Sequence, residues 1–274
     1  MTESEEVSSQ TEKDYRQCKR EDRPGIEKGS AQTKGLRCVY FNARSIVNKG
    51  DELRAWIDAW KCDVVAITET WMSQGQDWIL QVPGFRCFRK DREGGKRGGG
   101  VALLIRDRVT AVEKVDAVEG LSTESLWVEV RSGKGSITLL GVFYRPPNSN
   151  REVEEQIGKQ ILERCSNSRV VVMGDFNFPN IDWNIPRVRG LDGEEFVRCV
   201  QEGFLTQHVD KPTRGEAVLD LILANEPGQV SDLSVGEHLG DSDHNSISFM
   251  LALEKERIRQ AGRHLDGVRG NMKT

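Results

Sequence analysis

The sequence predicts one mixed α/β domain with many strands and few helices over residues 35–253. Three observations predict it: short apolar runs rich in β-branched residues, amphipathic helical segments between such runs, and polar side chains where the runs end. The run at 170–174 shows the pattern, because Asp175 and Asn177 follow it. Residues two apart in an extended chain point the same way, so both side chains can face one site. Taken alone, the pair is equally typical of a polar turn after a buried strand.

Composition narrows the class of protein. The 274 residues are 37% hydrophobic, enough for one large core or two modest ones. The net charge of −4 gives no global basic signature, so nucleic-acid binding would need a local basic face. The six cysteines form no CxxC pair, which indicates no zinc site and a reducing compartment, nuclear or cytoplasmic. No apolar leader and no apolar run of about 18 residues is present, so we expect neither secretion nor a membrane span.

The two ends of the chain differ in composition from the predicted domain. Residues 1–34 are rich in Glu, Lys, Arg, Ser and Gln and contain little to bury, which predicts a disordered, solvated leader. Residues 254–274 predict a charged tail that is helical and then frayed. Between them the sequence shows no internal repeat and no linker.

The first half of the domain begins with a strand, a helix and a second strand. Residues 36–42 and 63–71 are apolar runs that deliver Asn42 and Glu69 near their ends. Residues 51–60 have helical spacing. The expected apolar face of this helix consists of Leu53, Trp56, Ile57 and Trp60. Two strands joined by a helix suggest a site at the edge of the sheet where both strands end.

A glycine-rich, basic segment links the next two strands, which are predicted at 85–90 and 98–105. Glycines permit close approach of the backbone to a phosphate, and nearby cations would form a local basic face. The basic residues here are Arg89, Lys90, Arg92, Lys96 and Arg97. A flexible hairpin loop with ordinary surface charge explains the segment equally well.

The second half begins with strands at 125–130 and 136–144 around a turn. Two prolines follow Tyr144, so this side chain lies where the chain leaves the sheet. An amphipathic helix at 152–165 leads to the strand that carries Asp175.

The C-terminal part of the domain is predicted as a helix at 194–200, an extended piece at 204–209, and strands at 217–224, 230–235 and up to residue 251, with a loop at 236–240. Asp220 lies inside the apolar run of its strand, where a carboxylate usually has a partner or a function. Asp243 and His244 precede the last strand. His208 is expected to be an ordinary surface histidine.

Six strand ends therefore offer polar groups, and together they predict metal-assisted phosphodiester hydrolysis. Glu69 and Asp243 are hard oxygen donors suited to Mg²⁺. Asp175 can take a proton from water. His244, oriented by Asp220, can neutralise the charge of the transition state. The complete set is Asn42, Glu69, Tyr144, Asp175 with Asn177, Asp220, and Asp243 with His244.

Several motifs resemble the endonuclease/exonuclease/phosphatase superfamily, the fold of pancreatic deoxyribonuclease and the apurinic/apyrimidinic endonucleases. The most specific are Gly174-Asp175-Phe176-Asn177 and Ser242-Asp243-His244, followed by Thr68-Glu69-Thr70-Trp71 and Phe41-Asn42. Over residues 36–253 the chain is more similar still to the endonuclease domain of jockey-like non-LTR (LINE-type) retrotransposons. The phrases that carry this second resemblance lie at 41–45, 97–102, 144–148 and 212–215, the last leading to 219–222.

The resemblance implies a four-layer α/β sandwich, with two packed, mainly antiparallel or mixed β-sheets flanked by helices. It implies Mg²⁺, or Mn²⁺ in its place, held by Glu69, Asp243 and Asn42. Asp175 would activate water and Asp220 would orient His244. The expected substrate contacts are Asn42, Tyr144, Asn177, Thr213, Ser242, Lys96 and Arg97.

The function implied is a metal-dependent endonuclease that nicks target DNA for retrotransposon insertion, most simply as a monomer. A reverse transcriptase, RNA-directed DNA polymerase, and the element's RNA would belong to a longer parent protein, of which this chain would be a fragment or a decayed copy. Two alternatives stay open: another phosphoesterase of the superfamily, such as a lipid or inositol phosphatase, and a catalytically silent remnant that binds nucleic acid or protein.

Overall fold

Two six-stranded β-sheets form the centre of the protein. The computed structural model describes residues 35–94, 97–114, 123–183, 185, 187–188, 190 and 192–254. The first sheet has the strand order β13-β14-β1-β2-β4-β3. Its strands are β1 (Gly35–Asn42), β2 (Val64–Thr68), β3 (Phe85–Lys90), β4 (Val101–Arg106), β13 (Val230–His238) and β14 (Asn245–Ala252).

The second sheet has the strand order β11-β12-β8-β7-β6-β5. Its strands are β5 (Thr110–Lys114), β6 (Glu124–Arg131), β7 (Ile137–Tyr144), β8 (Arg169–Asp175), β11 (Thr206–Gln207) and β12 (Asp220–Ala224). A separate two-stranded ribbon pairs β9 (Ile181–Asp182) with β10 (Arg187–Val188). Each large sheet contains one parallel pair, β1 with β2 and β7 with β8, among antiparallel neighbours.

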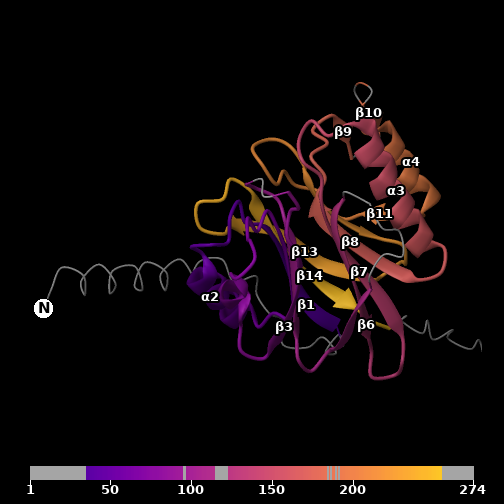
Figure 1. Ribbon diagram of the computed structural model, residues 1–274. Coiled ribbons are helices and arrows are strands. Elements are labelled where there is room, and N and C mark those ends of the chain that lie inside the picture. Colours follow the sequence, from indigo (N-terminus) through magenta and orange to yellow (C-terminus); the bar gives the residue numbers. More distant parts are fainter. Residues whose placement is uncertain are drawn as a thin grey trace, which may run out of the picture. The chain divides into compact units, whose positions relative to one another are not determined.

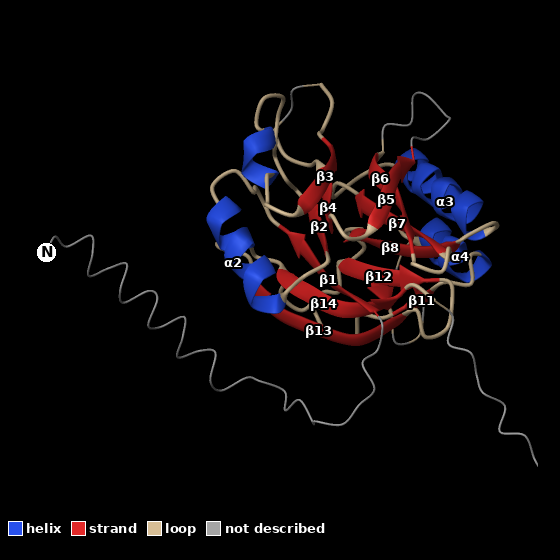
Figure 2. Cartoon of the chain, turned by 90° about the horizontal axis from the view of Figure 1, so that it is seen from below, coloured by secondary structure: helices blue, strands red, loops and turns tan. Residues whose placement is uncertain are grey.

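Helices cover the outer faces of the two sheets. They are α2 (Gly50–Trp60), α3 (Arg151–Cys165) and α4 (Glu194–Glu202), together with the 3₁₀ turn η1 (Asp77–Leu80). Figure 1 and Figure 2 show α2 on one side of the sheets and α3 with α4 on the other. The predicted four-layer α/β sandwich is therefore confirmed. Among the described residues we find no helix that could serve as a membrane span.

Strand β8 shows why its sequence is continuously apolar. Val171 and Met173 point into the core between the two sheets, whereas Val170 and Val172 point outward against α3 and α4. A strand that is buried on both faces has no position for a polar side chain, so Asp175 appears only where the strand ends.

Three predictions from the sequence were wrong: the burial of Trp60, the start of β12 and the end of β13. Trp60 was expected on the buried face of α2 but is 41% exposed, because the helix ends there and Lys61 turns the chain with φ 52°. Strand β12 begins at Asp220, not before it, because Thr213 Oγ1 accepts hydrogen bonds from the backbone N–H groups of Leu219 and Asp220. Strand β13 continues to His238, through part of the predicted loop.

Other expectations were not met or fall on residues that are not described. The edge strand β5 was not anticipated, since only Ala111 of its five residues is buried and the apolar signal is weak. The leader predicted at 1–34, and the tail after Glu254, lie outside the described residues.

Candidate active site

The predicted polar strand ends meet at one edge of the two sheets. Asn42 pairs with Thr68 in the parallel register of the first sheet, which places Glu69 immediately beyond that edge. In the second sheet Tyr144 pairs with Asp175, and Asp175 pairs with Asp220. The two sheets therefore bring these side chains together from opposite sides.

Asp175 is held by two asparagines that the sequence analysis also selected. Its Oδ2 accepts a hydrogen bond from Asn42 Nδ2 at 2.9 Å, and its Oδ1 accepts one from the backbone N–H of Asn177 at 3.1 Å. The side-chain amide of Asn177 donates to the carbonyl of Arg145 at 2.8 Å. These contacts leave the Asp175 carboxylate 1% exposed with a fixed orientation.

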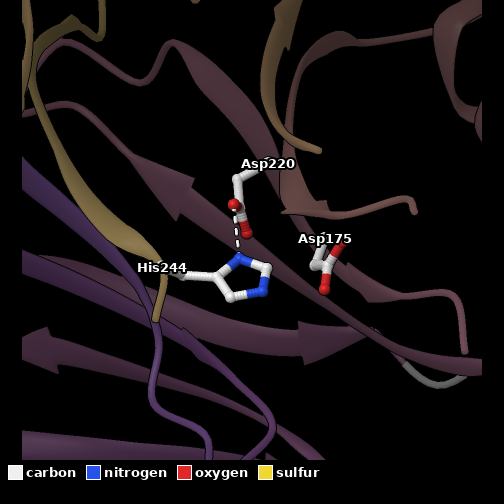
Figure 3. A group of neighbouring side chains, drawn as sticks. All are labelled: Asp175, Asp220 and His244. Atoms are coloured by element: carbon white, nitrogen blue, oxygen red, sulfur yellow. Dashed lines mark hydrogen bonds and ion pairs between the residues drawn. The ribbon is translucent and has the colours of Figure 1, made fainter. Parts of the chain in front are cut away.

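His244 and Asp220 form the buried pair predicted from the sequence. Asp220 Oδ2 lies 2.7 Å from His244 Nδ1, and Asp175 lies beside the imidazole on the side of Nε2 (Figure 3). One ligand atom from each of these three residues lies within 4.8 Å of those of the other two. The Nδ1 contact leaves Nε2 directed toward the site.

Tyr40 extends this chain of hydrogen bonds and was not predicted from the sequence. Its hydroxyl donates to Asp220 Oδ1 at 2.7 Å and lies 2.7 Å from the hydroxyl of Thr68. Asp220 is fully buried, so a second fixed partner offsets the cost of removing its charge from water. In the sequence Tyr40 is one apolar residue of a strand, and nothing there indicates a contact with the opposite sheet.

The environment moves the pKa values of the buried groups. Burial, and then the charge of Asp220, raise the pKa of Asp175 well above its ordinary value, although His244 opposes this. Burial lowers the pKa of His244, but the hydrogen bond and charge of Asp220 outweigh it, so the net pKa is raised. The contact with Asp220 therefore favours the protonated form of the His244 imidazole.

Glu69 and Asp243 lie on the more open side of the same edge. Glu69 has the left-handed conformation with φ 52°, and its Oε2 accepts a hydrogen bond from Trp71 Nε1 at 2.5 Å. Asp243 is 36% exposed and forms ion pairs with Arg44 at 3.5 Å and Arg214 at 2.7 Å. Burial raises its pKa, but Arg214 and other partners lower it by more.

The predicted substrate residues differ in burial and in their contacts with this edge. Ser242 is buried and its hydroxyl donates to the carbonyl of Asn42 at 2.7 Å. Thr213 is also fully buried and caps the start of β12, so it supports Asp220 rather than facing solvent. Arg97 is exposed, with its guanidinium 4.9 Å from the ring centre of Trp71. Lys96 lies outside the described residues.

Arg145 is a second residue that the sequence analysis missed. It is 1% exposed, and its guanidinium lies 4.0 Å from the ring centre of Phe178. It donates to the carbonyl of Asn177 at 3.1 Å and to Asp192 at 2.7 Å. Asn177 has φ 51°, and this anchor stabilises the turn that holds its amide at the site. The only sequence signal was an arginine between Tyr144 and a proline.

The donor set at this edge fits a divalent cation. Three carboxyl groups, those of Asp175, Asp220 and Glu69, face a single imidazole; burial first, and then the charges of Asp220 and Glu69, raise the pKa of Asp175. Mg²⁺ is a hard cation that binds oxygen atoms, usually those of one or two carboxylates together with water and phosphate. The ion pairs of Asp243 join partly exposed groups and each contributes about 0–1 kcal/mol, so a cation can displace them.

Comparison with known sequences gives one family. The model of the Endonuclease/Exonuclease/phosphatase family matches residues 39–244. The chain is 26% identical over 152 residues to the RNA-directed DNA polymerase from mobile element jockey of Drosophila melanogaster, covering 56% of this chain and 16% of that protein. It is 21% identical over 238 residues to the probable RNA-directed DNA polymerase from transposon BS of the same organism, covering 83% of this chain and 25% of that protein. The chain thus spans a quarter or less of these relatives.

Solved structures share the fold. The endonuclease domain of TRAS1, a telomere-specific non-LTR retrotransposon, superposes with a TM-score of 0.64 at 20% identity, covering 81% of this chain and 100% of that chain. A 3′-5′ exonuclease from Neisseria meningitidis gives 0.61 at 14% identity, covering 79% and 99%. A mannosyl-6-phosphatase from Bacteroides thetaiotaomicron gives 0.56 at 14% identity, covering 78% and 98%.

Proposed function

The chain belongs to the Endonuclease/Exonuclease/phosphatase family, and on that premise we propose that it is a metal-dependent DNA endonuclease. The family and its relatives support a hydrolytic nuclease or phosphoesterase role in general terms. The finer proposal adds a divalent metal, Mg²⁺ or Mn²⁺, and DNA as the substrate that is nicked. It also makes the chain the endonuclease part of a longer protein with reverse transcriptase, monomeric and acting in the nucleus or cytoplasm.

One observation carries the proposal: a buried Asp220–His244 pair with the carboxylate of Asp175 next to it. A purely structural role would not require two carboxylates and an imidazole to be desolvated together, because each costs free energy to bury. Such an arrangement suits a reaction in which a proton moves and negative charge develops.

In the proposed mechanism Asp175 accepts the proton of the attacking water, with its orientation set by Asn42 and Asn177. As the water oxygen bonds to phosphorus, the bond from phosphorus to the 3′ oxygen breaks, and the leaving oxygen takes a proton from solvent. The protonated His244, held by Asp220, stabilises the negative charge that develops on the phosphate. Asn177 and Tyr144 donate hydrogen bonds to phosphate oxygens. Burial raises the pKa of Tyr144, so the phenol stays a donor at neutral pH.

Glu69, Asn42 and Asp243 would hold the metal ion. When bound, such a cation polarises the phosphate and neutralises its charge. The half-buried position of Glu69 leaves this side of the site open to solvent and substrate.

DNA is proposed as the substrate because the sequence relatives are RNA-directed DNA polymerases from mobile elements, and because one structural relative is a retrotransposon endonuclease domain. The exposed Arg97 at the catalytic edge suits a phosphate backbone. A sugar-phosphate phosphatase is the second candidate, since the mannosyl-6-phosphatase shares the fold.

The test is nicking of supercoiled plasmid with Mg²⁺, measured for the wild type and for Asp175→Asn and His244→Ala. We expect nicking that EDTA abolishes and that each variant reduces about 10²- to 10⁴-fold. Asp51→Asn, a change of a fully exposed carboxylate on α2, is the matched control and should nick like the wild type. Release of phosphate from sugar phosphates or phosphoinositides without nicking would favour the phosphatase. A folded wild type without either activity would favour a silent remnant.

A further inference from the structure

Arg92 joins the two sheets beside the proposed active site. It follows β3 of the first sheet, and its Nε donates to Glu124 Oε1 of the second sheet at 2.7 Å. Glu124 is the first residue of β6 and lies directly opposite Tyr144 in the β6–β7 ladder. The guanidinium of Arg92 lies 5.7 Å from the ring centre of Tyr144. Arg92 therefore contacts both the last residue of β7 and the residue paired with it.

Glycines at 98–100 leave the space that this contact needs. Their φ angles are 104°, 66° and 83°, in the region that favours glycine. A Cβ atom at Gly99 would lie 2.0 Å from Glu124 Oε2 and 2.5 Å from Arg92 Nε. A Cβ atom at Gly98 would lie 3.0 Å from the Nη1 of Arg92. No larger residue fits at Gly99 without displacing the ion pair.

The glycine segment also binds the pair directly. The backbone N–H of Gly100 donates to Glu124 Oε2 at 2.5 Å, so both oxygens of this carboxylate are used. The carbonyl of Gly99 accepts a hydrogen bond from the backbone N–H of Trp71, in the loop that carries Glu69. One segment thus fixes the Arg92–Glu124 pair and the Glu69 loop together.

Arg92 is poorly placed to bind the DNA backbone itself. Its side chain is 22% exposed, and that of Glu124 is 13% exposed. The Nη1 of Arg92 donates to the carbonyl of Arg97 at 3.3 Å, and its charge is neutralised by Glu124. A half-buried ion pair of this kind is screened little by salt and holds its geometry better than an exposed one.

We propose that Arg92, seated by Glu124 and the glycines at 98–100, is a positioning residue that fixes the phenol of Tyr144 for contact with the substrate phosphate. The inference rests on the proposed function, in which Tyr144 contacts that phosphate. It gives the glycine segment a different role from the close approach to phosphate considered in the sequence analysis. The glycines make room for the ion pair.

The kinetic test uses nicking by Arg92→Gln, alone and combined with Tyr144→Phe. We expect Arg92→Gln to lower kcat about 10- to 100-fold while KM for DNA changes less than about 3-fold, because a misplaced donor is lost mainly in the transition state. In the Tyr144→Phe background the same change should have no further effect on kcat. A loss of equal size in both backgrounds, or a loss confined to KM, would overturn the proposal.

A pair of glycine variants separates the contact from backbone strain. Gly99→Ala and Gly94→Ala both place alanine at a positive φ, 66° and 80°. Among the described residues, chain neighbours aside, no atom lies within 4 Å of the Cβ at Gly94. We expect Gly99→Ala to reproduce the kcat loss of Arg92→Gln and Gly94→Ala to keep wild-type kcat. Equal kcat values for the two glycine variants would contradict the proposed role of Gly99 in making room for the Arg92–Glu124 ion pair.

A spectroscopic readout keeps the inference independent of activity. In protein labelled with ¹³C at tyrosine Cζ, the Tyr144 resonance, assigned by its loss in Tyr144→Phe, reports the surroundings of the phenol. We expect Arg92→Gln and Gly99→Ala to shift it and Gly94→Ala to leave it unchanged, even if the wild type does not nick DNA. An unchanged resonance in Arg92→Gln would overturn the positioning role, whereas absent nicking with a shifted resonance would overturn only the proposed function.

Discussion

The two sides of the proposed active site differ in how their polar groups are held. The buried side consists of Asn42, Asp175, Asn177, Asp220 and His244, all 8% exposed or less. The open side consists of Glu69, Asp243, Arg44, Arg97 and Arg214, which are partly or largely exposed. Buried polar groups need fixed partners, whereas exposed ion pairs rearrange at little cost. We infer that the buried side is preorganised for proton and charge chemistry and that the open side exchanges contacts with metal and DNA.

The largest effect is expected from Asp220→Asn on the buried side. The variant keeps the shape of the side chain but removes the charge that raises the pKa of His244, and burial then lowers that pKa. Nicking should fall about 10²-fold or more. Because the imidazole acts as a cation in the proposed mechanism, activity is lost as pH rises through its pKa. The alkaline limb of the pH–rate profile should therefore move to lower pH. An unchanged limb would contradict the proposed role of His244 as a cation.

The same pair contributes to stability with a definite sign. The pKa of His244 is raised in the folded state, so its contribution is fully present below the ordinary value of about 6.5 and is lost as pH rises through the folded-state pKa. Urea unfolding of the wild type and His244→Gln across this range should show a difference in stability that shrinks with rising pH. A difference that grows with pH would contradict the raised pKa.

A smaller effect on activity, and a clear effect on stability, is expected from Arg145→Met. The change removes hydrogen bonds to the carbonyl of Asn177 and to Asp192, and it takes the donor from the carbonyl of the buried Asn177. We expect a loss of about 2–3 kcal/mol in the free energy of unfolding. Arg151→Met, at a side chain that is 72% exposed on α3, is the control and should cost less than about 0.5 kcal/mol.

The smallest effect is expected from Arg97→Ala on the open side. This exposed cation would neutralise one phosphate, so its removal should weaken DNA binding a few-fold and lower the salt slope by about 1. Fluorescence anisotropy at several salt concentrations measures both. Arg131→Ala removes a half-exposed arginine at the other end of β6, and it should leave the slope unchanged. Equal slopes for wild type and Arg97→Ala would exclude a phosphate contact at this residue.

Most strands, and the polar residues at their ends, could be predicted from the sequence because both depend on the pattern of neighbouring residues. The run before Asp175 is apolar at every position and rich in β-branched valines, which is typical of a strand buried on both faces. The resemblance to retrotransposon endonuclease domains in the same family is confirmed by the family match and by the jockey and TRAS1 relatives. The individual roles of Asp175, His244 and Glu69 stay predictions.

Contacts between the two sheets could not be predicted from the sequence. Tyr40 and Asp220 are 180 positions apart, and neither run shows that one side chain reaches the other. The Arg92–Glu124 pair spans 32 positions and depends on glycines whose need is visible only when both side chains are placed. The structure also shows that Thr213, expected to contact substrate, is buried behind the start of β12.

We infer that the carboxylates of the open side, together with Asn42, bind the metal, whereas Asp175, Asp220 and His244 on the buried side carry the proton and charge chemistry. The most direct test is a Mg²⁺ titration of the nicking rate for Glu69→Gln and Asp220→Asn, two carboxylate-to-amide changes on opposite sides of the edge. We predict that Glu69→Gln raises the Mg²⁺ concentration for half-maximal rate about 10-fold or more, while Asp220→Asn lowers the maximal rate at an unchanged Mg²⁺ midpoint. Equal midpoint shifts in both variants, or an unchanged midpoint in Glu69→Gln, would contradict it.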